Sequence, residues 1–255
     1  MLYSKTLSSK DKRLAPHPVL PEYYTDEESR RERVDQMFDS SAEHYDWICN
    51  VMSFGSGGFY RQQALLRGGL KSGMHLLDVG AGTGEVSLLA QKIVGDKGIV
   101  VALDPSKGML SEAKKLGVEK ATMGLGEALP FPDNSFDMLT MGFALRHVAD
   151  LGQAFVEYHR VLKPGGKVLL LEISRPESSL FTTLLKVYMK GIVPLITRIF
   201  RRSVNAQELM RYYWDTIEHC VRPDVIVDAL KIAGLVDAKR HIAMGIFSEY
   251  SGIKK

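Results

Sequence analysis

The chain has 255 residues, of which 45% are hydrophobic and 25% are charged. These fractions are ordinary for a globular protein, so they exclude an intrinsically disordered chain and a small scaffold held together by disulfides. The 33 Lys and Arg residues nearly balance the 30 Asp and Glu residues, which gives a formal net charge of +3. Because this charge is small, we expect no nucleic-acid partner, and chemistry on a small molecule becomes the leading function class.

The cysteines and the N-terminus indicate the compartment. Cys49 and Cys220 are too few for a disulfide framework and cannot form a four-ligand zinc site on their own. We therefore expect a cytoplasmic protein without a metal site. The N-terminus lacks the apolar core of a signal peptide, and no run of about 18 uncharged apolar residues is present to cross a bilayer. The protein should be soluble or meet a membrane only at its surface.

The N-terminal part of the chain divides into an arm and a helical segment. Residues 1–25 combine basic residues with three prolines, a composition typical of a flexible arm without a fold of its own. Thr25 can cap a helix, and Glu28 stands three residues later, as in a capping box. We expect a helical lid over residues 26–70 and the main domain over 71–255.

From residue 75 onward, short aliphatic runs alternate with amphipathic stretches. The candidate strands are residues 75–79, 99–104, 136–141 and 167–173, and the helical patterns between them are residues 85–94, 106–116 and 150–162. This alternation is typical of parallel strands with helices on both faces. Two last strands can form a hairpin around Gly245. The predicted fold is α/β, a doubly wound, mostly parallel seven-stranded sheet, with a helical insertion after strand five at about 178–217.

The most specific local motif is LLDVGAGTGE, in which a buried strand leads through Gly80, Gly82 and Gly84 into a helix. Glycines at such a junction let the backbone turn sharply and approach a nucleotide-like ligand. In the dinucleotide motif the third glycine stands one position later, and here Glu85 would repel a pyrophosphate at the helix N-terminus. A cationic sulfonium cofactor, S-adenosylmethionine, suits the motif better.

Two carboxylates lie near this glycine loop. Asp104 ends the second strand, 20 residues after Gly84, where it can accept hydrogen bonds from both ribose hydroxyls. Asp78 lies within the first strand and can face the amino group of the methionine moiety, directly or through water. In the alternative interpretation, the glycines only permit a tight turn and the acids cap or pair locally.

From about Val34 to Gly234 the chain resembles the class I S-adenosylmethionine-dependent methyltransferases, which have a Rossmann-like fold. The stretches ALPFPDNSFD and VLKPGG support that superfamily, whereas YDWICNVMSFG and FALRHV point to the ubiquinone/menaquinone biosynthesis C-methyltransferases of the UbiE type. The resemblance implies S-adenosylmethionine as cofactor and a lipophilic quinol or related phenol as methyl acceptor.

The resemblance also implies roles for individual residues. The cofactor site would comprise the glycine loop with Thr83, the two carboxylates, Met109 near the adenine, and Gly126, Glu127 and Gly142. Arg146 would face the acceptor, and Asp46 would belong to the lid. Tyr45 and Asn50 would belong to the same lid and bind the acceptor. Apart from the resemblance, Tyr188 and Tyr212 are aromatic candidates for acceptor binding, with packing as the alternative for the tyrosines. The chain departs from the family pattern at positions 125, 142 and 147. Leu125 replaces a polar residue that can bind the adenine amino group, Gly142 replaces a serine and His147 replaces an asparagine.

Methyl transfer to a ring carbon requires an electron-rich acceptor, most simply a phenolate. We hypothesise that His147 is the base, because an unperturbed imidazole pKa near 6.5 suits proton transfer at neutral pH. Arg146 would lower the energy of the phenolate and orient its oxygen. The alternative is that Arg146 pairs with a carboxylate and His147 caps or packs.

Residues 180–200 form an apolar segment with basic residues at intervals. Lys186 and Lys190 stand at helical spacing, and Pro194 should break or kink the helix. The broad apolar face between them comprises Phe181, Leu184, Leu185, Tyr188, Ile192 and Leu195. It can belong to a core helix or to an acceptor tunnel at the membrane surface, where four basic residues would lie near anionic headgroups: Lys190, Arg198, Arg201 and Arg202.

Other functions stay open on the sequence alone. The fold and cofactor could serve O- or N-methylation of another metabolite or a different transfer from S-adenosylmethionine. A non-catalytic cofactor-binding module and a nicotinamide-dependent oxidoreductase are further alternatives. The oligomeric state is open as well, with a homodimer as one option.

Overall fold

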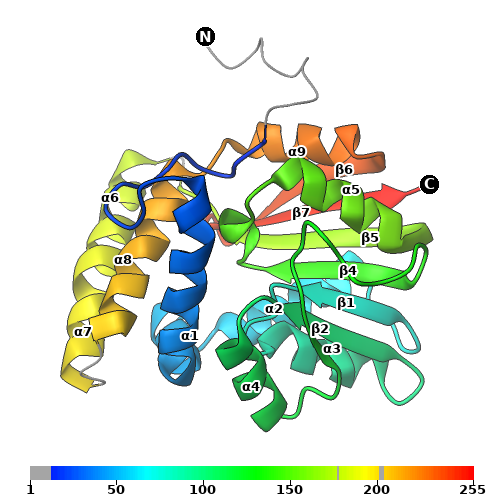
Figure 1. The fold of residues 1–255 in the computed structure, drawn as a ribbon, viewed down its shortest axis with the longest axis horizontal. Helices are drawn as coiled ribbons and strands as arrows, with labels where there is room; N and C mark the ends of the chain where they lie inside the picture. Colours follow the sequence, from blue (N-terminus) through cyan, green and yellow to red (C-terminus); the bar gives the residue numbers. More distant parts are fainter. Residues whose placement is uncertain (1–12, 177, 201–203) are drawn as a thin grey trace.

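The computed structural model describes residues 13–176, 178–200 and 204–255. A seven-stranded sheet forms its centre, with the strand order β3-β2-β1-β4-β5-β7-β6 (Figure 1). Five strands are parallel: β1 (His75–Val79), β2 (Ile99–Asp104), β3 (Ala121–Met123), β4 (Phe136–Gly142) and β5 (Leu162–Ile173). The last two, β6 (Leu235–Ala243) and β7 (Phe247–Lys254), form the hairpin around Gly245, and β7 is antiparallel to β5. The predicted, mostly parallel sheet is confirmed.

Helices cover both faces of the sheet and bury two apolar cores. On one face, α2 (Gly57–Gly68) and α3 (Glu85–Val94) pack against the strands. On the other face lie α5 (Leu151–Val161) and α9 (Pro223–Ile232). Helix α4 (Lys107–Lys115) follows β2 and packs beside β3. This arrangement leaves the carboxyl ends of the parallel strands as the edge at which a ligand can bind.

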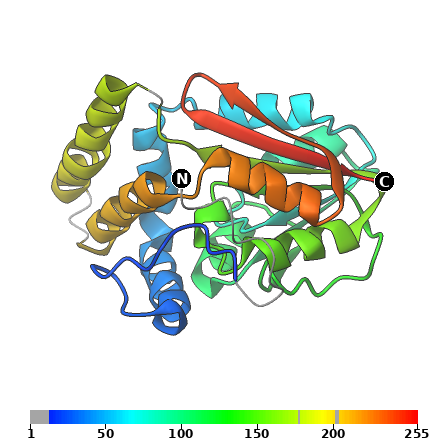
Figure 2. The ribbon, with the colours of Figure 1, turned by 90° about the horizontal axis from the view of Figure 1, so that it is seen from above.

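A third group of helices stands beside that edge, on the left in Figure 1 and Figure 2. It consists of α1 (Glu27–Met52), α8 (Val204–His219) and the outermost pair, α6 (Ser179–Val187) and α7 (Val193–Phe200). Together they bury an apolar cluster of their own that includes Met37, Ile48 and Trp214. Of the segment expected to be a lid, α1 lies over the strand ends, whereas α2 packs on the sheet.

Helix α1 begins one residue later than the sequence suggested. Its N-cap is Asp26, whose carboxylate accepts a 2.7 Å hydrogen bond from the Ser29 amide, while the Asp26 amide donates to the Ser29 hydroxyl. The prediction of Thr25 and Glu28 as the capping pair was therefore wrong, because the same reciprocal pattern is satisfied one residue further on.

Residues 13–25 are packed rather than free, which corrects the expectation of a structureless arm for this part. His17, Leu20 and Tyr24 are buried. The backbone amide of Leu151 donates to the carbonyl of Leu14, and the amide of Val221 donates to that of Pro16. Residues 1–12 lie outside the described residues.

The α6–α7 pair is joined by a π-helical turn, η2 (Tyr188–Ile192), which ends two residues before Pro194. Proline lacks an amide hydrogen, and in a regular helix its ring collides with the carbonyl four residues earlier. The wider π-helical turn relieves this clash, and it lies where the sequence predicted a break or kink. By length and composition alone, Ser179–Phe200 is a helix apolar enough to cross a membrane, with a mean hydropathy of 1.3. The expectation concerned an uncharged apolar run of about 18 residues, and this helix contains Lys186, Lys190 and Arg198.

Candidate active site

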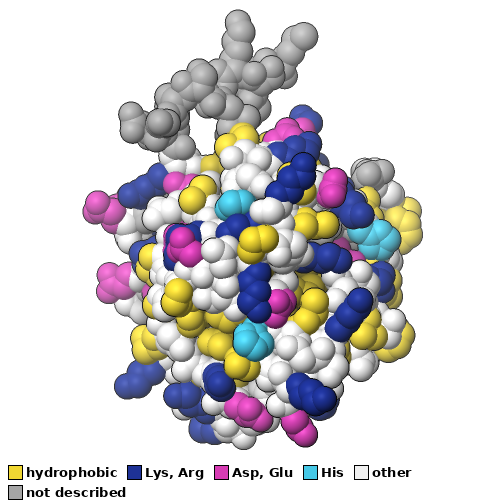
Figure 3. Space-filling model, turned by 90° about the vertical axis from the view of Figure 1, so that its right-hand side faces the viewer, with side chains coloured by type: hydrophobic (Ala, Val, Ile, Leu, Met, Phe, Trp, Pro, Cys, Tyr) yellow, Lys and Arg dark blue, Asp and Glu magenta, His cyan; other side chains and the backbone are white. Residues whose placement is uncertain are grey.

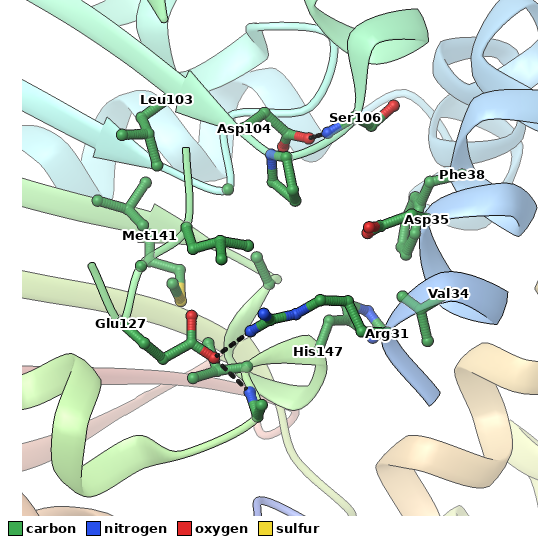
Figure 4. Close-up of a pocket in the computed structure, with 18 of the residues that line it drawn as sticks. Arg31, Val34, Asp35, Phe38, Leu103, Asp104, Ser106, Glu127, Met141 and His147 are labelled. Atoms are coloured by element: carbon green, nitrogen blue, oxygen red, sulfur yellow. Dashed lines mark hydrogen bonds and ion pairs between the residues drawn. The ribbon is translucent and has the colours of Figure 1, made fainter. Parts of the chain in front are cut away.

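A cavity of about 540 Å³ lies at the carboxyl ends of β1, β2 and β4 and is covered by α1 (Figure 4). Its floor comes from the segments that follow these strands, and its roof includes Val34, Asp35 and Phe38 of α1. The predicted cofactor residues that line it are Gly80, Gly82, Asp104, Met109, Gly126, Glu127 and Gly142. A concave site of this size and place is suited to a nucleotide-like molecule.

The glycine loop needs its glycines for two different reasons. Gly80, Gly82 and Gly84 have φ values of +64°, +56° and +86°, a region that other residues avoid. A Cβ on Gly80 would lie 2.5 Å from Ala144, and one on Gly84 would lie 2.4 Å from Val118, so these two glycines permit packing. At Gly82 no atom lies within 4 Å of such a Cβ, which leaves room for a ligand against the backbone.

Asp104 is fixed by the loop that it faces. One carboxylate oxygen accepts a hydrogen bond from the Gly82 amide and the other accepts one from the Ser106 amide, each at 2.8 Å. Burial raises the pKa of the Asp104 carboxyl to about 6. Each oxygen retains a lone pair, so the carboxylate can still accept hydrogen bonds from the hydroxyls of a bound ribose.

The opposite wall of the cavity comes from the segment after β3. Leu125 contributes an apolar surface where the family pattern has a polar residue, and a Cβ on Gly126 would lie 2.8 Å from the Tyr158 hydroxyl. Glu127 accepts a 2.7 Å hydrogen bond from the Ala149 amide and lies 3.6 Å from the Arg31 guanidinium (Figure 4). Glu127 therefore links this wall to helix α1.

Three predicted cofactor residues do not line the cavity: Gly84, whose packing is described above, Asp78 and Thr83. Asp78 is fully buried, and its carboxylate accepts hydrogen bonds from Ser87 at 2.7 Å and from Thr140 at 3.0 Å. Successive strand side chains point to opposite sides, so Val79 faces the cavity and Asp78 does not. A contact of Asp78 with the methionine amino group, directly or through water, stays a prediction. Thr83 is also buried, and its hydroxyl donates to the carboxylate of Asp46.

A second, smaller cavity of about 80 Å³ adjoins the first and shares Tyr45 and Phe143 with it. Most of its lining is apolar or aromatic, and comes from α1, α2, α8, the α6–η2 region and the turn before β7. Its two charged lining residues are Arg61 and Arg146. Such a lining is suited to an apolar ring that carries a polar substituent.

Arg146 is held rigidly at the wall of this second cavity. Its Nε donates to Glu172 at 2.8 Å, and its Nη1 donates to the Thr216 hydroxyl at 2.7 Å and the Tyr213 carbonyl at 3.2 Å. Both charged side chains are almost completely buried. The structure therefore contains the alternative in which Arg146 pairs with a carboxylate. The guanidinium also borders the second cavity.

Arg61 is a residue that the sequence did not single out. It forms a 2.6 Å ion pair with Glu85 and lies over the Phe143 ring, 5.1 Å from the ring centre. No local pattern could reveal this contact, because 24 residues separate Arg61 from Glu85.

His147 lies half-buried between α1 and α8. Its Nδ1 lies 3.3 Å from the Tyr212 hydroxyl, its ring packs against Phe38, and its Nε2 has no hydrogen-bond partner among the described residues. Burial and, after it, the positive charge of Arg146 hold the pKa of His147 well below 6.5. The premise of an unperturbed pKa was therefore wrong, because burial and the neighbouring positive charge both disfavour the imidazolium.

The four predicted acceptor residues have different surroundings. Tyr45 lines both cavities and receives a 2.8 Å hydrogen bond from the Tyr213 hydroxyl. Tyr212 is buried behind His147, outside both cavity linings. Asn50 is exposed, and Tyr188 donates a 2.8 Å hydrogen bond to the Val51 carbonyl. The structure places Tyr45 alone, of these four, at the site.

These features fit S-adenosylmethionine. Gly82 leaves space against the backbone, Asp104 offers buried acceptor oxygens, and Leu103, Met109 and Leu125 provide apolar walls for a flat base. In the part of the chain that the structure describes, no three His, Cys, Asp or Glu side chains are grouped so as to hold a metal ion.

Known proteins with similar sequences or folds were compared with the chain. A sequence model of the ubiE/COQ5 methyltransferase family matches residues 26–254. A demethylmenaquinone methyltransferase of Staphylococcus aureus is 36% identical over 190 residues, covering 73% of this chain and 79% of its own. The ubiquinone/menaquinone biosynthesis C-methyltransferase UbiE of Pseudoalteromonas translucida is 32% identical over 240 residues, covering 89% and 93%.

Solved structures support the fold. A methyltransferase from Thermotoga maritima, described as a possible histamine N-methyltransferase, aligns with a TM-score of 0.62 at 22% identity, covering 86% of this chain and 99% of its own. Phosphoethanolamine N-methyltransferase 2 of Haemonchus contortus, solved with S-adenosyl-L-methionine, aligns with a TM-score of 0.62 at 18% identity, covering 92% and 61%. The resemblance deduced from the motifs is confirmed, and the family match favours methyl transfer over a nicotinamide-dependent reaction or passive binding. The chain belongs to the ubiE/COQ5 methyltransferase family and is an S-adenosylmethionine-dependent methyltransferase.

Proposed function

We propose that this enzyme methylates a ring carbon of a lipophilic quinol. The observation that carries the proposal is the contact between the two cavities, which share Tyr45 and Phe143. An apolar ring in the second cavity would lie directly against the cofactor cavity. The relatives named as quinone-biosynthesis methyltransferases, at 32–36% identity, support the same acceptor class.

The cofactor's place follows from the residues that line the first cavity. When bound, S-adenosylmethionine supplies an electrophilic methyl group on a sulfonium centre. Asp104 would accept hydrogen bonds from the ribose hydroxyls, and Gly82 would let the backbone approach the ligand. Leu125 and Met109 would enclose the adenine by apolar contact. Helix α1, which roofs the cavity, would exclude water from the reacting groups.

The acceptor's polar end would meet the two arginines. Arg146 is charged and held by Glu172, so it can stabilise a phenolate oxygen without reorganising. Arg61 can approach the same oxygen from the α2 side. Stabilising the phenolate increases electron density on the ring carbons, one of which would form the new bond to the methyl group as the bond to sulfur breaks. That carbon would then lose its hydrogen as a proton, by way of water, which restores the aromatic ring. Holding the ring against the cofactor cavity supplies the near-attack geometry.

His147 would receive the phenolic proton on Nε2, the ring atom without a partner among the described residues. Because His147 lines the first cavity and not the second, a water molecule would link the two groups. Because burial disfavours the imidazolium, the proton would pass on to solvent rather than remain on the ring.

A cell-based measurement tests the acceptor. Mass spectrometry of the isoprenoid quinones should show a demethylated precursor accumulating when the protein is absent, and an unchanged quinone pool would contradict the proposal. Fragmentation of the product formed from a short-chain quinol in vitro identifies the methylated atom. A methyl group on oxygen would favour the O-methyltransferase alternative instead.

The location of the enzyme follows from this acceptor. A lipophilic quinol dissolves in a bilayer, so the proposal includes a cytoplasmic enzyme with access to a membrane surface. The homodimer considered from the sequence stays a prediction.

A further inference from the structure

The helix formed by α6, η2 and α7 lies at the outer edge of the molecule (Figure 2). It carries a band of exposed apolar side chains. Eight of its large hydrophobic residues are 45% to 70% exposed: Leu180, Phe181, Leu184, Val187, Ile192, Leu195, Ile199 and Phe200. Large exposed apolar patches mark interaction surfaces in soluble proteins. Figure 3 shows the opposite side of the molecule, where acidic, basic and hydrophobic side chains are interspersed.

This helix is not a core helix. Only 22% of its most apolar window is buried, whereas the core helix of a soluble protein is mostly buried. Its buried positions recur at helical spacing, with Met189, Val193 and Thr197 facing the protein. One face is therefore packed on the protein and the other meets solvent, the pattern of a helix that lies in a membrane interface rather than across the bilayer.

The charge of the segment indicates which partner covers this face. Residues 178–207 contain five Lys and Arg residues and no Asp or Glu. Lys186 and Lys190 pair with Glu218 and Asp215 of α8, which leaves Arg198 exposed at the outer end. A second copy of the same face would bring like charges together, whereas a bilayer with anionic lipids offers complementary charge and an apolar interior.

The same helix also forms part of the second cavity. Leu185 and Met189 line that cavity from the inner side of the helix. Phe54, in the loop between α1 and α2, is 84% exposed and stacks on Tyr188 with ring centres 5.3 Å apart. The apolar outer surface and the cavity wall are thus separated by the thickness of one helix.

We infer that α6–η2–α7 docks on the surface of an anionic lipid bilayer. The lipid-borne acceptor then enters the second cavity between this helix and the Phe54 loop. The entry route rests on the proposed function, whereas the docking surface rests on exposure and charge alone.

Flotation of the full-length protein with vesicles tests the docking. The vesicles contain phosphatidylcholine alone or phosphatidylcholine with phosphatidylglycerol. We expect the wild type to float with the anionic vesicles and to be released by salt. The variant Leu184→Ser/Leu195→Ser/Ile199→Ser should lose about tenfold or more in partitioning, because it removes three apolar side chains from the buried area. Arg198→Glu should weaken binding to the anionic vesicles selectively.

The matched control carries three similar changes on other surfaces, Leu116→Ser/Val156→Ser/Ile232→Ser, at positions that are 51%, 56% and 68% exposed. It should float like the wild type. Equal flotation of both triple variants, or no flotation of the wild type, would overturn the docking surface. A wild-type dimer that the α6–α7 triple variant converts to a monomer would show that a second copy covers the face, and would also overturn it.

Activity measurements with two acceptors test the entry route and the proposed function separately from the docking surface. The α6–α7 triple variant should methylate a short-chain, water-soluble quinol at the wild-type rate and lose activity toward a long-chain quinol embedded in vesicles. Equal loss with both acceptors would contradict the entry route. A wild-type enzyme that methylates neither quinol would refute the proposed function, while the flotation result would still decide the docking surface.

Discussion

The hydroxyl of Thr83, in the turn of the glycine loop, donates a hydrogen bond to the carboxylate of Asp46 on α1. Nearer the N-terminus of the same helix, Asp39 accepts hydrogen bonds from the Ser106 hydroxyl and, at 2.9 Å, from the Gly108 amide. Helix α1 is therefore fastened to two of the backbone segments that surround the cofactor cavity, those after β1 and β2. Departure of a ligand from beneath α1 requires such bonds to open.

The Asp46–Thr83 bond should slow ligand release. Asp46→Ala and Thr83→Ala should each raise the dissociation rate of S-adenosylhomocysteine by about fivefold, as expected for one lost hydrogen bond of about 1 kcal/mol. Because both variants break the same bond, the double variant should dissociate no faster than either single one. Stopped-flow displacement measures these rates. Multiplication of the two single effects would show that the bond does not couple α1 to the loop.

Two glycines of the loop should respond differently to substitution. Gly84→Ala places a Cβ 2.4 Å from Val118 at a positive φ, so we expect it to destabilise the fold by about 3 kcal/mol or more. Gly82→Ala meets no atom within 4 Å, and its cost should be limited to the backbone strain of about 1–2 kcal/mol. It should nevertheless weaken cofactor binding by tenfold or so, because its methyl group takes up ligand space. Urea unfolding and calorimetric titration give the two quantities, and equal stability losses would contradict the distinction.

The fold was predictable where burial leaves a periodic pattern. The sequence predicted β1 and β2 with the bounds that the structure has. Strands of a parallel sheet are covered on both faces, so they appear in the sequence as nearly continuous aliphatic stretches. Strand β3 has three residues and none of them is buried. Neither its length nor its pattern distinguishes it from a loop, so it was found only in the structure.

The site was predictable where one local motif supplies it. The glycine loop and Asp104 act through backbone geometry that the sequence encodes within one βαβ unit. The contacts of Asp39 and Asp46 with these loops join residues 37 or more positions apart. Such contacts depend on how α1 packs across the strand ends, and packing of this kind leaves no signal in the local sequence.

Binding of the cofactor should weaken in acid because of Asp104. Its carboxyl has a pKa of about 6 in the free enzyme, and the protonated form loses acceptor oxygens for the ribose hydroxyls. Affinity for S-adenosylhomocysteine should therefore be full above that pKa and fall about tenfold by one unit below it. Calorimetric titration across this range checks the profile. Asp104→Asn should abolish the pH dependence, and Asp78→Asn, which lies off the cavity, should keep it.

Stability should depend on pH through His17. Burial, and then the charge of Arg30, lower the pKa of His17 from 6.5 to about 4, so the folded state resists a proton that the unfolded chain accepts at 6.5. Stability is therefore full above about pH 6.5 and falls as the pH drops toward 4. Relative to His17→Asn, the wild type should lose about 2 kcal/mol between about pH 7.5 and 5. Urea unfolding of both proteins checks this difference, and parallel pH profiles would contradict it.

The buried Arg146–Glu172 pair allows the structural role of Arg146 to be separated from its proposed role toward the acceptor. Arg146→Met or Glu172→Gln alone should destabilise the protein by about 3–5 kcal/mol, because the remaining group is left buried without its partner. Arg146→Met/Glu172→Leu removes both charges and should recover most of that stability. If the guanidinium stabilises the phenolate, the recovered double variant should still transfer methyl groups about 100-fold more slowly, with unchanged affinity for S-adenosylhomocysteine. A double variant with both stability and turnover restored would show that Arg146 acts only in the packing of the site.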